Sequence, residues 1–482
     1  MKLESLDATN LGSLVNTKQV SPIEVIEYFA NLIEEKNKCL NAFTYLKIDE
    51  ALDEAKELEK RINRGEYVGP FAGVPVGLKD FLPTKKGWTN SHGGVKSLIQ
   101  VDDCDSIFYE AAKNLGAIAI GKTNAPAFGF RGTTDNKLYG PTRNPYNLAY
   151  NSGGSSGGSA SAVGSRMVPL AECGDAGGSA RIPSAWCNCF AIKPSAGLVP
   201  SICRPDAWTA THPYCCGGPT SRSVRDSAIL LDAMQAFNAR DPLSVPLDKK
   251  DFKQRRSIEG LKICYTFDFD LYPRCDSEIE TAIESTFDVL LDSGAACVEP
   301  VNFAFKHTLH EIEEAWLLGI SIDDSITPET VQTLLEHPED VPEEFLYWHN
   351  RAKSATMLDY RKFHEIRTDI LDAHLDVFDK YDIILAPVTG CMPVKNSDDS
   401  NTLGPQTIGG QAVDRLIGFG YTYLENMVGT PAASVPIKLG KNNLPIGLQV
   451  IGRRYFDEVV FSVAYALEEV NPWAPYYEAI KC

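Results

Sequence analysis

Residues 174–183 read Gly-Asp-Ala-Gly-Gly-Ser-Ala-Arg-Ile-Pro, and they are the most informative stretch of the sequence. The glycines allow the backbone to turn several N–H groups toward one point, directly ahead of the Ser179 hydroxyl. An oxyanion hole requires this geometry. A surface turn would also tolerate Gly-Gly-Ser, so the interpretation depends on partners elsewhere in the chain.

Two further blocks precede this stretch at fixed distances. Residues 77–80 read Gly-Leu-Lys-Asp after a short apolar run, and residues 153–160 read Gly-Gly-Ser-Ser-Gly-Gly-Ser-Ala. Ser155 and Ser179 are 24 residues apart (179 − 155). In order and spacing, the three blocks resemble the amidase signature family, and similar segments extend over most of the chain, at residues 121–124, 140–145, 193–195, 429–433 and 447–449.

The resemblance implies a fold, a reaction and a set of site residues. The fold is of the α/β class, with a central mixed β-sheet covered by helices on both faces. The reaction is hydrolysis of a carboxamide through an acyl-enzyme, with Lys79 as base, Ser155 as bridging serine and Ser179 as nucleophile. The oxyanion hole would consist of the backbone N–H groups of Ala176, Gly177, Gly178 and Ser179, and the supporting residues would be Asp175, Arg181 and Ser156. This chemistry needs neither a metal nor an organic cofactor.

Lys79 can act as a base only if its neutral form is populated near neutral pH. The apolar neighbours Val76 and Leu78 are consistent with burial, which lowers the pKa of a lysine. The Asp80 carboxylate would raise that pKa, so we expect it to point away from Lys79. The family usually enters the bridging serine through a cis peptide, which the glycines before Ser155 would tolerate.

Four positions depart from the family pattern. Ala180 stands where a branched residue is usual, Glu172 where a hydrophobic residue is common, and Asn188 and Ala191 where glycines are common. None of these changes removes an atom of the three proposed catalytic side chains. They affect the shape of the loop and the lining of the pocket.

Two other glycine motifs compete with this interpretation. Residues 116–123 match the phosphate-loop pattern GxxxxGK[ST], but the four inner residues form an apolar strand pattern, which is the wrong context for that loop. Residues 153–157 match the GxSxG nucleophile elbow, which needs a downstream histidine base. The candidates for that base are His212, His307, His310, His337, His349, His364 and His374.

The substrate is left open between several kinds of amidase. The A subunit of glutamyl-tRNA amidotransferase usually carries a tyrosine-rich stretch where residues 355–363 read Ala-Thr-Met-Leu-Asp-Tyr-Arg-Lys-Phe, which favours a stand-alone enzyme. Asp175-Ala176 and the late Asn471-Pro472-Trp473 are similar to the 6-aminohexanoate cyclic dimer hydrolase branch. A catalytically silent binding protein is disfavoured because all three catalytic side chains are present.

Composition sets the remaining expectations. The 482 residues carry a net charge of −18, which disfavours nucleic acids and anionic membranes as partners. The resemblance implies a small-molecule amide as the partner. The chain has no apolar run of membrane-spanning length and no signal-peptide pattern near its start, so we expect a cytoplasmic protein. Thirteen scattered cysteines indicate mostly reduced thiols rather than metal ligands. A homodimer is left open.

We expect a single amidase signature domain over residues 1–482. It would comprise N-terminal helices (1–65), a catalytic core (66–225), a variable helical region (226–380) and a C-terminal return to the sheet (381–482). Apolar runs at residues 381–387 and 445–451 predict strands near the end of the chain, so distant segments should share one sheet.

Overall fold

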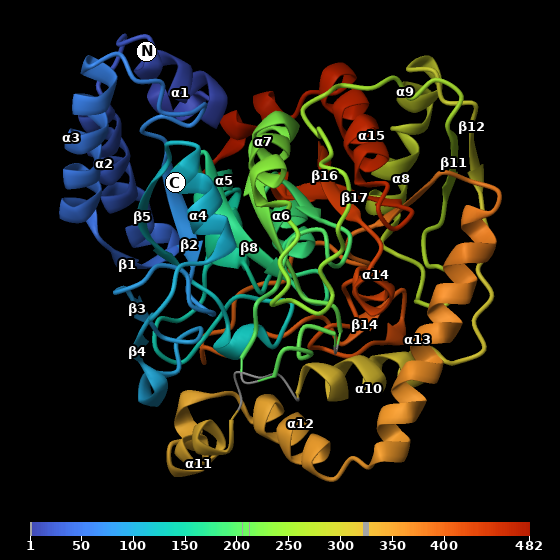
Figure 1. Ribbon diagram of the computed structural model, residues 1–482. Coiled ribbons are helices and arrows are strands. Elements are labelled where there is room, and N and C mark those ends of the chain that lie inside the picture. Colours follow the sequence, from blue (N-terminus) through green and yellow to red (C-terminus); the bar gives the residue numbers. More distant parts are fainter. Residues whose placement is uncertain (1, 205, 212, 322–326) are drawn as a thin grey trace.

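The computed structural model describes residues 2–204, 206–211, 213–321 and 327–482 (Figure 1). Within them, eleven strands form one mixed sheet in the order β1-β5-β2-β8-β10-β9-β16-β17-β13-β11-β12, flanked by helices, as predicted. The strands are β1 Phe43–Leu46, β2 Pro75–Lys79, β5 Ile118–Thr123, β8 Leu170–Asp175, β9 Phe190–Lys193, β10 Cys216–Ser221, β11 Lys262–Tyr265, β12 Cys297–Pro300, β13 Ile383–Pro387, β16 Ala432–Leu439 and β17 Pro445–Gly452. Short two-stranded pairs are β3 Thr89–Asn90 with β4 Gln100–Val101, β6 Arg143–Asn144 with β7 Asn147–Asn151, and β14 Thr407–Ile408 with β15 Gln411–Ala412.

The sheet combines segments that lie far apart in the sequence. Strand β2 runs parallel to β5 and to β8, whereas the central strands from β8 to β13 pair antiparallel. Strands β16 and β17 come from the last part of the chain, yet they lie between β9 and β13. Every residue of β13 and β17 is buried, which explains why their sequences are almost entirely apolar, with Gln449 as the exception.

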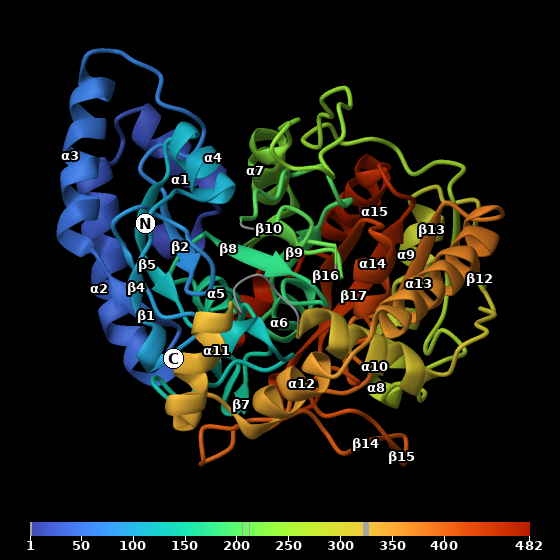
Figure 2. The ribbon, with the colours of Figure 1, turned by 60° about the horizontal axis from the view of Figure 1, so that its bottom comes forward.

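Fifteen α-helices accompany the sheet in the described residues. They are α1 Ala8–Asn16, α2 Pro22–Leu40, α3 Ile48–Asn63, α4 Ile107–Asn114, α5 Gly157–Gly164, α6 Arg181–Trp186, α7 Val224–Met234, α8 Ser277–Glu284, α9 Phe287–Asp292, α10 Leu309–Ile320, α11 Pro328–Glu336, α12 Glu343–Lys353, α13 Met357–Phe378, α14 Tyr423–Val428 and α15 Asp457–Val470. Helices α1, α2 and α3 gather at the β1–β5 side, while α10, α11 and α12 form a group that comes forward in Figure 2. None of these described helices combines the length and the apolar character that a membrane crossing needs.

The three blocks singled out in the sequence meet where β2 and β8 lie side by side. Strand β2 ends at Lys79 and β8 ends at Asp175, and the two strands pair in parallel. Helix α5 begins directly after Ser156, and α6 begins directly after Ala180. The carboxyl ends of two parallel strands and the amino ends of two helices therefore converge, which is a common location for a binding site in α/β proteins.

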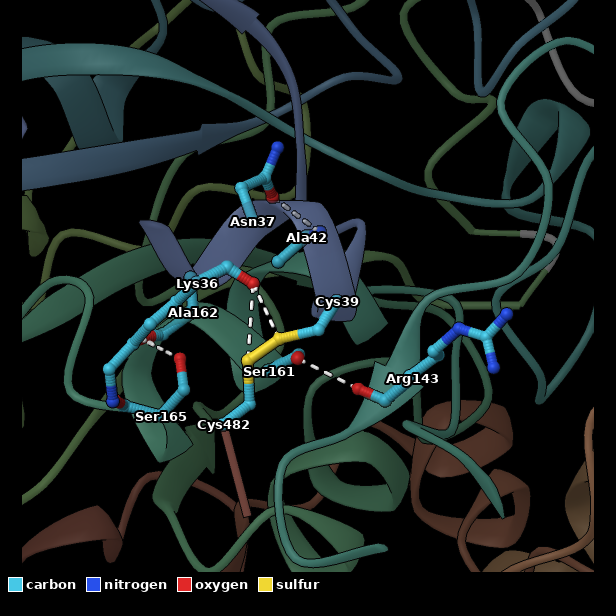
Figure 3. Close-up of a disulfide and its surroundings, with 9 residues drawn as sticks. All are labelled: Lys36, Asn37, Cys39, Ala42, Arg143, Ser161, Ala162, Ser165 and Cys482. Atoms are coloured by element: carbon cyan, nitrogen blue, oxygen red, sulfur yellow. Dashed lines mark hydrogen bonds between the residues drawn. A yellow bond between two sulfur atoms is a disulfide. The ribbon is translucent and has the colours of Figure 1, made fainter. Parts of the chain in front are cut away.

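A disulfide joins helix α2 to the last residue of the chain. Cys39 on α2 is bonded to Cys482, the last residue, with a Cα–Cα distance of 6.7 Å (Figure 3). The two sulfurs lie 2.9 and 3.5 Å from the Lys36 carbonyl oxygen. The other eleven cysteines form no disulfide in the described residues.

Candidate active site

Lys79 and Ser155 form a buried hydrogen-bonded pair. The Lys79 Nζ donates to the Ser155 Oγ over 2.8 Å, and the two residues are only 5% and 2% exposed. The Phe81 ring lies 5.4 Å from the same amine and covers it on one side. The ammonium thus has a neutral hydroxyl, and not a carboxylate, as its side-chain hydrogen-bond partner.

Burial lowers the pKa of Lys79, because removing the amine from water disfavours its charged form. Cys173, Cys215, Asp175 and Glu172 oppose this effect to a smaller extent. The Asp80 carboxylate points elsewhere, as predicted: it accepts hydrogen bonds from the Ser91 N–H at 2.9 Å and the Ser91 hydroxyl at 2.5 Å.

Ser155 lies in a tight glycine-rich turn that is entered through a cis Gly154–Ser155 peptide. A Cβ on Gly154 would lie 2.6 Å from the Thr133 carbonyl carbon, so a side chain does not fit there. The turn is attached to the next block by Ser156, whose N–H donates to the Ser179 carbonyl over 3.1 Å and whose hydroxyl donates to the Gly174 carbonyl over 3.3 Å. Ser156 therefore joins the turn that holds Ser155 to the ends of the Ser179 loop.

Ser179 lies on the loop between β8 and α6 and is half-buried, so it is more accessible than Ser155. The loop folds around the Asp175 carboxylate, which accepts the Gly178 N–H at 2.8 Å and the Ala180 N–H at 3.2 Å. The Gly178 N–H is thus already engaged within the protein, in contrast to the expectation from the sequence. This leaves the N–H groups of Ala176, Gly177 and Ser179 as candidates for the oxyanion hole.

The Asp175–Arg181 pair lies in the protein interior and not on the surface. Arg181 Nε and one terminal nitrogen lie 3.0 and 2.9 Å from the Asp175 carboxylate, and Arg181 and Asp175 are 0% and 1% exposed. Although burial alone would raise the pKa of Asp175, the Arg181 guanidinium lowers it to about 2. Arg181 also donates to Glu425 and Asn426 on α14 and to Gln449 on β17, so it attaches the loop to two distant elements.

Two residues that sequence reasoning missed hold the same loop from outside. The Trp316 indole N–H on α10 donates to the Ala176 carbonyl over 2.9 Å, and the Thr422 hydroxyl donates to the Gly177 carbonyl over 2.6 Å. A Cβ on Gly177 would lie 2.4 Å from Trp316, which requires glycine there. A lone tryptophan in a helix and a lone threonine in a loop carry no sequence signal for such a role.

A family model described as Amidase matches residues 24–461, which is most of the chain. The chain therefore belongs to the amidase family. It is 28% identical to an acylamidase of Rhodococcus erythropolis over 98% of this chain and 97% of that one, and 30% identical to the A subunit of the glutamyl-tRNA(Gln) amidotransferase of Agathobacter rectalis over 98% and 95%. Among solved structures, a bacterial aryl acylamidase of the amidase signature family superimposes with a TM-score of 0.95 at 38% identity over 98% of both chains. A 6-aminohexanoate cyclic dimer hydrolase has the same fold, with a TM-score of 0.83 at 24% identity over 98% of both chains.

These comparisons identify the chain as a hydrolase acting on amide C–N bonds, and a stand-alone amidase is the best supported form of it. Its phosphate-loop pattern has a different role. Gly121, Lys122 and Thr123 belong to β5, and the fully buried Lys122 Nζ lies 2.6 Å from the Asp102 carboxylate. A nucleotide phosphate could not reach that lysine without breaking this pair.

The nucleophile-elbow interpretation of residues 153–157 is also unsupported in this amidase. Ser155 Oγ accepts its hydrogen bond from Lys79, not from a histidine. His307 contacts Asp369 at 2.9 Å and the buried His374 contacts the Ile370 carbonyl at 2.8 Å, while His212 lies outside the described residues. Where the structure describes the chain, His, Cys, Asp and Glu side chains do not gather in groups of three or more that could hold a metal ion.

Proposed function

We propose that this amidase cleaves its substrate through an acyl-enzyme on Ser179, with Ser155 as the bridging serine and Lys79 as the base. The observation that carries the proposal is the 2.8 Å hydrogen bond between Lys79 Nζ and Ser155 Oγ inside a buried site. A serine hydroxyl becomes a strong nucleophile only when a base takes its proton, and a desolvated lysine can be that base.

In the proposed cycle, Lys79 takes the proton of Ser155 while Ser155 takes that of Ser179. Ser179 Oγ then forms a bond to the amide carbonyl carbon, and the resulting oxyanion meets the N–H groups of Ala176, Gly177 and Ser179. Collapse of this intermediate breaks the C–N bond, and the proton from Lys79 passes through Ser155 to the departing amine. Water repeats the sequence on the ester and releases the acid.

We propose an N-acyl arylamine as the substrate class. The 38% identical aryl acylamidase supports this choice, as does the aromatic character of the side chains around the Ser179 loop. Trp316 packs on Gly177 and lies 6.1 Å from the Tyr423 ring, which in turn meets the Tyr272 ring edge-on at 5.7 Å. Such rings suit an aryl group. Linear and cyclic 6-aminohexanoate amides are the alternative among stand-alone enzymes.

A glutaminase function within a larger complex is a second candidate, because the A subunit of a glutamyl-tRNA(Gln) amidotransferase is a relative at 30% identity. The segment that is usually tyrosine-rich in that protein contains only Tyr360 here and forms the start of α13. This difference favours the aryl amide.

The decisive experiment measures hydrolysis of aryl amides, aliphatic amides, cyclic oligoamides and glutamine by the wild type and by Ser179→Ala, Ser155→Ala and Lys79→Ala. We expect aryl amides to be cleaved best and all three variants to lose activity by at least about a hundredfold. A serine-directed fluorophosphonate should label the wild type but not Ser179→Ala. Hydrolysis by Ser179→Ala would overturn the assignment, and hydrolysis of glutamine alone would favour the glutaminase function.

The remaining proposals concern the surroundings of the reaction. We propose that activity needs no metal or organic cofactor, so that a chelator leaves kcat unchanged. We also propose a cytoplasmic location, although a disulfide such as Cys39–Cys482 is uncommon in that compartment, and cell fractionation would test it. Membership of the amidase family supports a small-molecule amide as partner, and the net charge of −18 disfavours a nucleic acid.

A further inference from the structure

Glu172 lies on β8 at the point where β8 separates from β2. The two strands pair at Val76–Leu170 and Gly77–Ala171, and their pairing ends there. On its other side, β2 remains paired with β5 as far as Lys79–Thr123. On the side that faces β8, the backbone of Lys79 therefore lies past the last paired residues and has no strand partner.

The Glu172 side chain accepts the Lys79 N–H in place of a backbone carbonyl of β8. Its Oε2 accepts the Lys79 N–H over 3.2 Å, and its Oε1 accepts the Ser106 hydroxyl over 2.8 Å. Ser106 is the N-cap of α4, where its Oγ accepts the Tyr109 N–H at 3.1 Å. One carboxylate thus joins the backbone of Lys79 to the first turn of a helix.

The main chain of Glu172 is itself firmly held. Its carbonyl accepts the Ser159 hydroxyl of α5 over 2.6 Å. Ser159 Oγ lies 2.7 Å from Thr123 Oγ1 on β5, and that Thr123 oxygen lies 3.2 Å from the Leu78 carbonyl of β2. The side chain of Glu172 therefore starts from a rigid position.

We propose that Glu172 is a positioning residue for Lys79. By binding the Lys79 N–H it fixes the end of β2, from which the amine reaches Ser155 Oγ. This proposal rests on the role of Lys79 proposed above. A displacement of about 1 Å in such a pair can cost about a hundredfold in rate, so a single backbone contact here matters.

When Glu172 is ionised it places a negative charge near Lys79, and the groups that act on this charge can be named. The cations that act on it are Lys79 on β2 and Lys122 on β5, and burial raises its pKa to about 7 against their attraction and the hydrogen bonds from Ser106 and Lys79. Cys173 and Asp175 follow on β8 and act on the same lysine, as does Cys215. Helix α5 carries no titratable side chain, and Pro219 of β10 lies opposite Glu172.

Above about pH 7, where Glu172 is charged, it stabilises the protonated form of Lys79, which is inactive as a base. Removing the charge while keeping the acceptor oxygen, as in Glu172→Gln, should therefore shift the part of the acidic limb of the kcat/KM profile above that pH to lower pH. Removing the acceptor as well, as in Glu172→Leu, should let the strand end move.

The experiment compares Glu172→Gln, Glu172→Leu and the wild type in amide hydrolysis across pH, together with Glu110→Gln as a control. Glu110 is an exposed carboxylate on α4, so its removal matches the change in charge without touching β2. We expect Glu172→Leu to lose about 10- to 100-fold in kcat with little change in KM, and Glu172→Gln to recover most of that loss with its acidic limb moved to lower pH. Glu110→Gln should match the wild type.

The proposal fails if the Glu172→Gln profile superimposes on that of the wild type while Glu172→Leu keeps its kcat. Circular dichroism of both variants identifies a general loss of folding, and equal kcat losses in the folded Gln and Leu variants would also count against the proposal.

Lys79→Ala in the same assay separates the proposed role of Glu172 from the proposed role of Lys79. An active Lys79→Ala overturns the base itself, whereas an inactive one with unaffected Glu172 variants overturns only the role of Glu172.

Discussion

Two buried lysines at the ends of neighbouring strands show how individual residues acquire different chemistry. Lys122 on β5 is fully buried and paired with Asp102 at 2.6 Å, whereas the hydrogen-bond partner of Lys79 is the neutral Ser155 hydroxyl. Burial without a paired anion favours the neutral amine. The pKa of Lys79 is accordingly lowered. The family resemblance identified Lys79 as the base, but the pairing of Lys122 with Asp102 could not be predicted, because Asp102 has no fixed spacing to Lys122.

Replacing Lys79 by arginine tests whether its role is that of a base. Arginine retains the positive charge but does not deprotonate in proteins, so Lys79→Arg should lose at least about a hundredfold in kcat/KM at every pH. The wild-type rate should rise with pH along a limb that lies below the ordinary lysine range, because burial lowers the pKa of Lys79. Stopped-time assays from acidic to alkaline pH would measure both effects. A Lys79→Arg variant with wild-type activity would mean that only the charge matters.

Glu313 makes a second prediction, about stability. It is 7% exposed, and burial, with a smaller effect of Asp414, raises its pKa to about 8. The folded state therefore binds its proton more tightly than the unfolded chain, and this stabilisation is lost as pH rises from about 4.5 through 8. Glu313→Gln has no carboxyl group to ionise there, so its unfolding free energy should not fall with pH for this reason. Relative to the wild type, its unfolding free energy should increase by roughly 2–4 kcal/mol between pH 4 and pH 9.

Urea denaturation at several pH values would measure this difference. The exposed control Glu110→Gln should follow the wild-type curve, since its charge is in water in both states. Parallel pH curves for Glu313→Gln and the wild type would show that Glu313 is already ionised at no cost in the folded protein.

At the scale of elements, local signals were predictable and the contacts between distant elements were not. The start of α2 carries a local signal in Ser21, Pro22 and Glu24, which form a capping box in the structure. In contrast, α10 is placed over the Ser179 loop by one indole hydrogen bond and one glycine, and nothing in its own sequence pattern indicates this. The role of Glu172 was missed for the same reason. It was noticed as a departure from the family pattern, but its partners Ser106 and Lys79 lie on other elements.

The contact of α10 with the loop leads to a third prediction. Trp316→Phe keeps most of the aromatic packing on Gly177 but removes the hydrogen bond to the Ala176 carbonyl. Losing one such bond costs about 0.5–1.5 kcal/mol, so we expect kcat to fall by about 2- to 10-fold through a less ordered oxyanion loop. Steady-state kinetics with an aryl amide would measure it.

Trp473 provides the matched control for this change. It is a buried tryptophan whose indole N–H donates to the Arg222 carbonyl over 2.9 Å, away from the Ser179 loop. Trp473→Phe removes one indole hydrogen bond, as Trp316→Phe does, so both variants should lower the thermal midpoint of unfolding by similar amounts. Only Trp316→Phe should lower kcat. If both variants changed kcat equally, the contact of α10 would have no specific role in catalysis.

At the scale of the whole molecule, the end of the chain returns to its beginning. Strands β16 and β17 complete the middle of the sheet, and the chain then runs through α15 to a tail that reaches α2. The Lys481 N–H donates to the Pro145 carbonyl over 2.9 Å, and Cys482 is bonded to Cys39 (Figure 3). Apolar runs predicted the returning strands, but an odd number of scattered cysteines could not indicate which two would meet.

The disulfide leads to the last prediction, because the bonded residues are separated by 443 positions and so restrict nearly the whole unfolded chain. Reduction should lower the unfolding free energy by about 2–4 kcal/mol, measured as a lower urea midpoint with dithiothreitol than without it. Cys39→Ser is the control, since its midpoint should equal that of the reduced wild type and should not respond to the reductant. Thiol titration of the denatured, unreduced protein should count eleven thiols, rising to the full thirteen after reduction. Thirteen thiols before reduction, together with a urea midpoint that does not change with dithiothreitol, would show that Cys39 and Cys482 lie close together without a bond. Packing alone would then hold the C-terminal tail against α2.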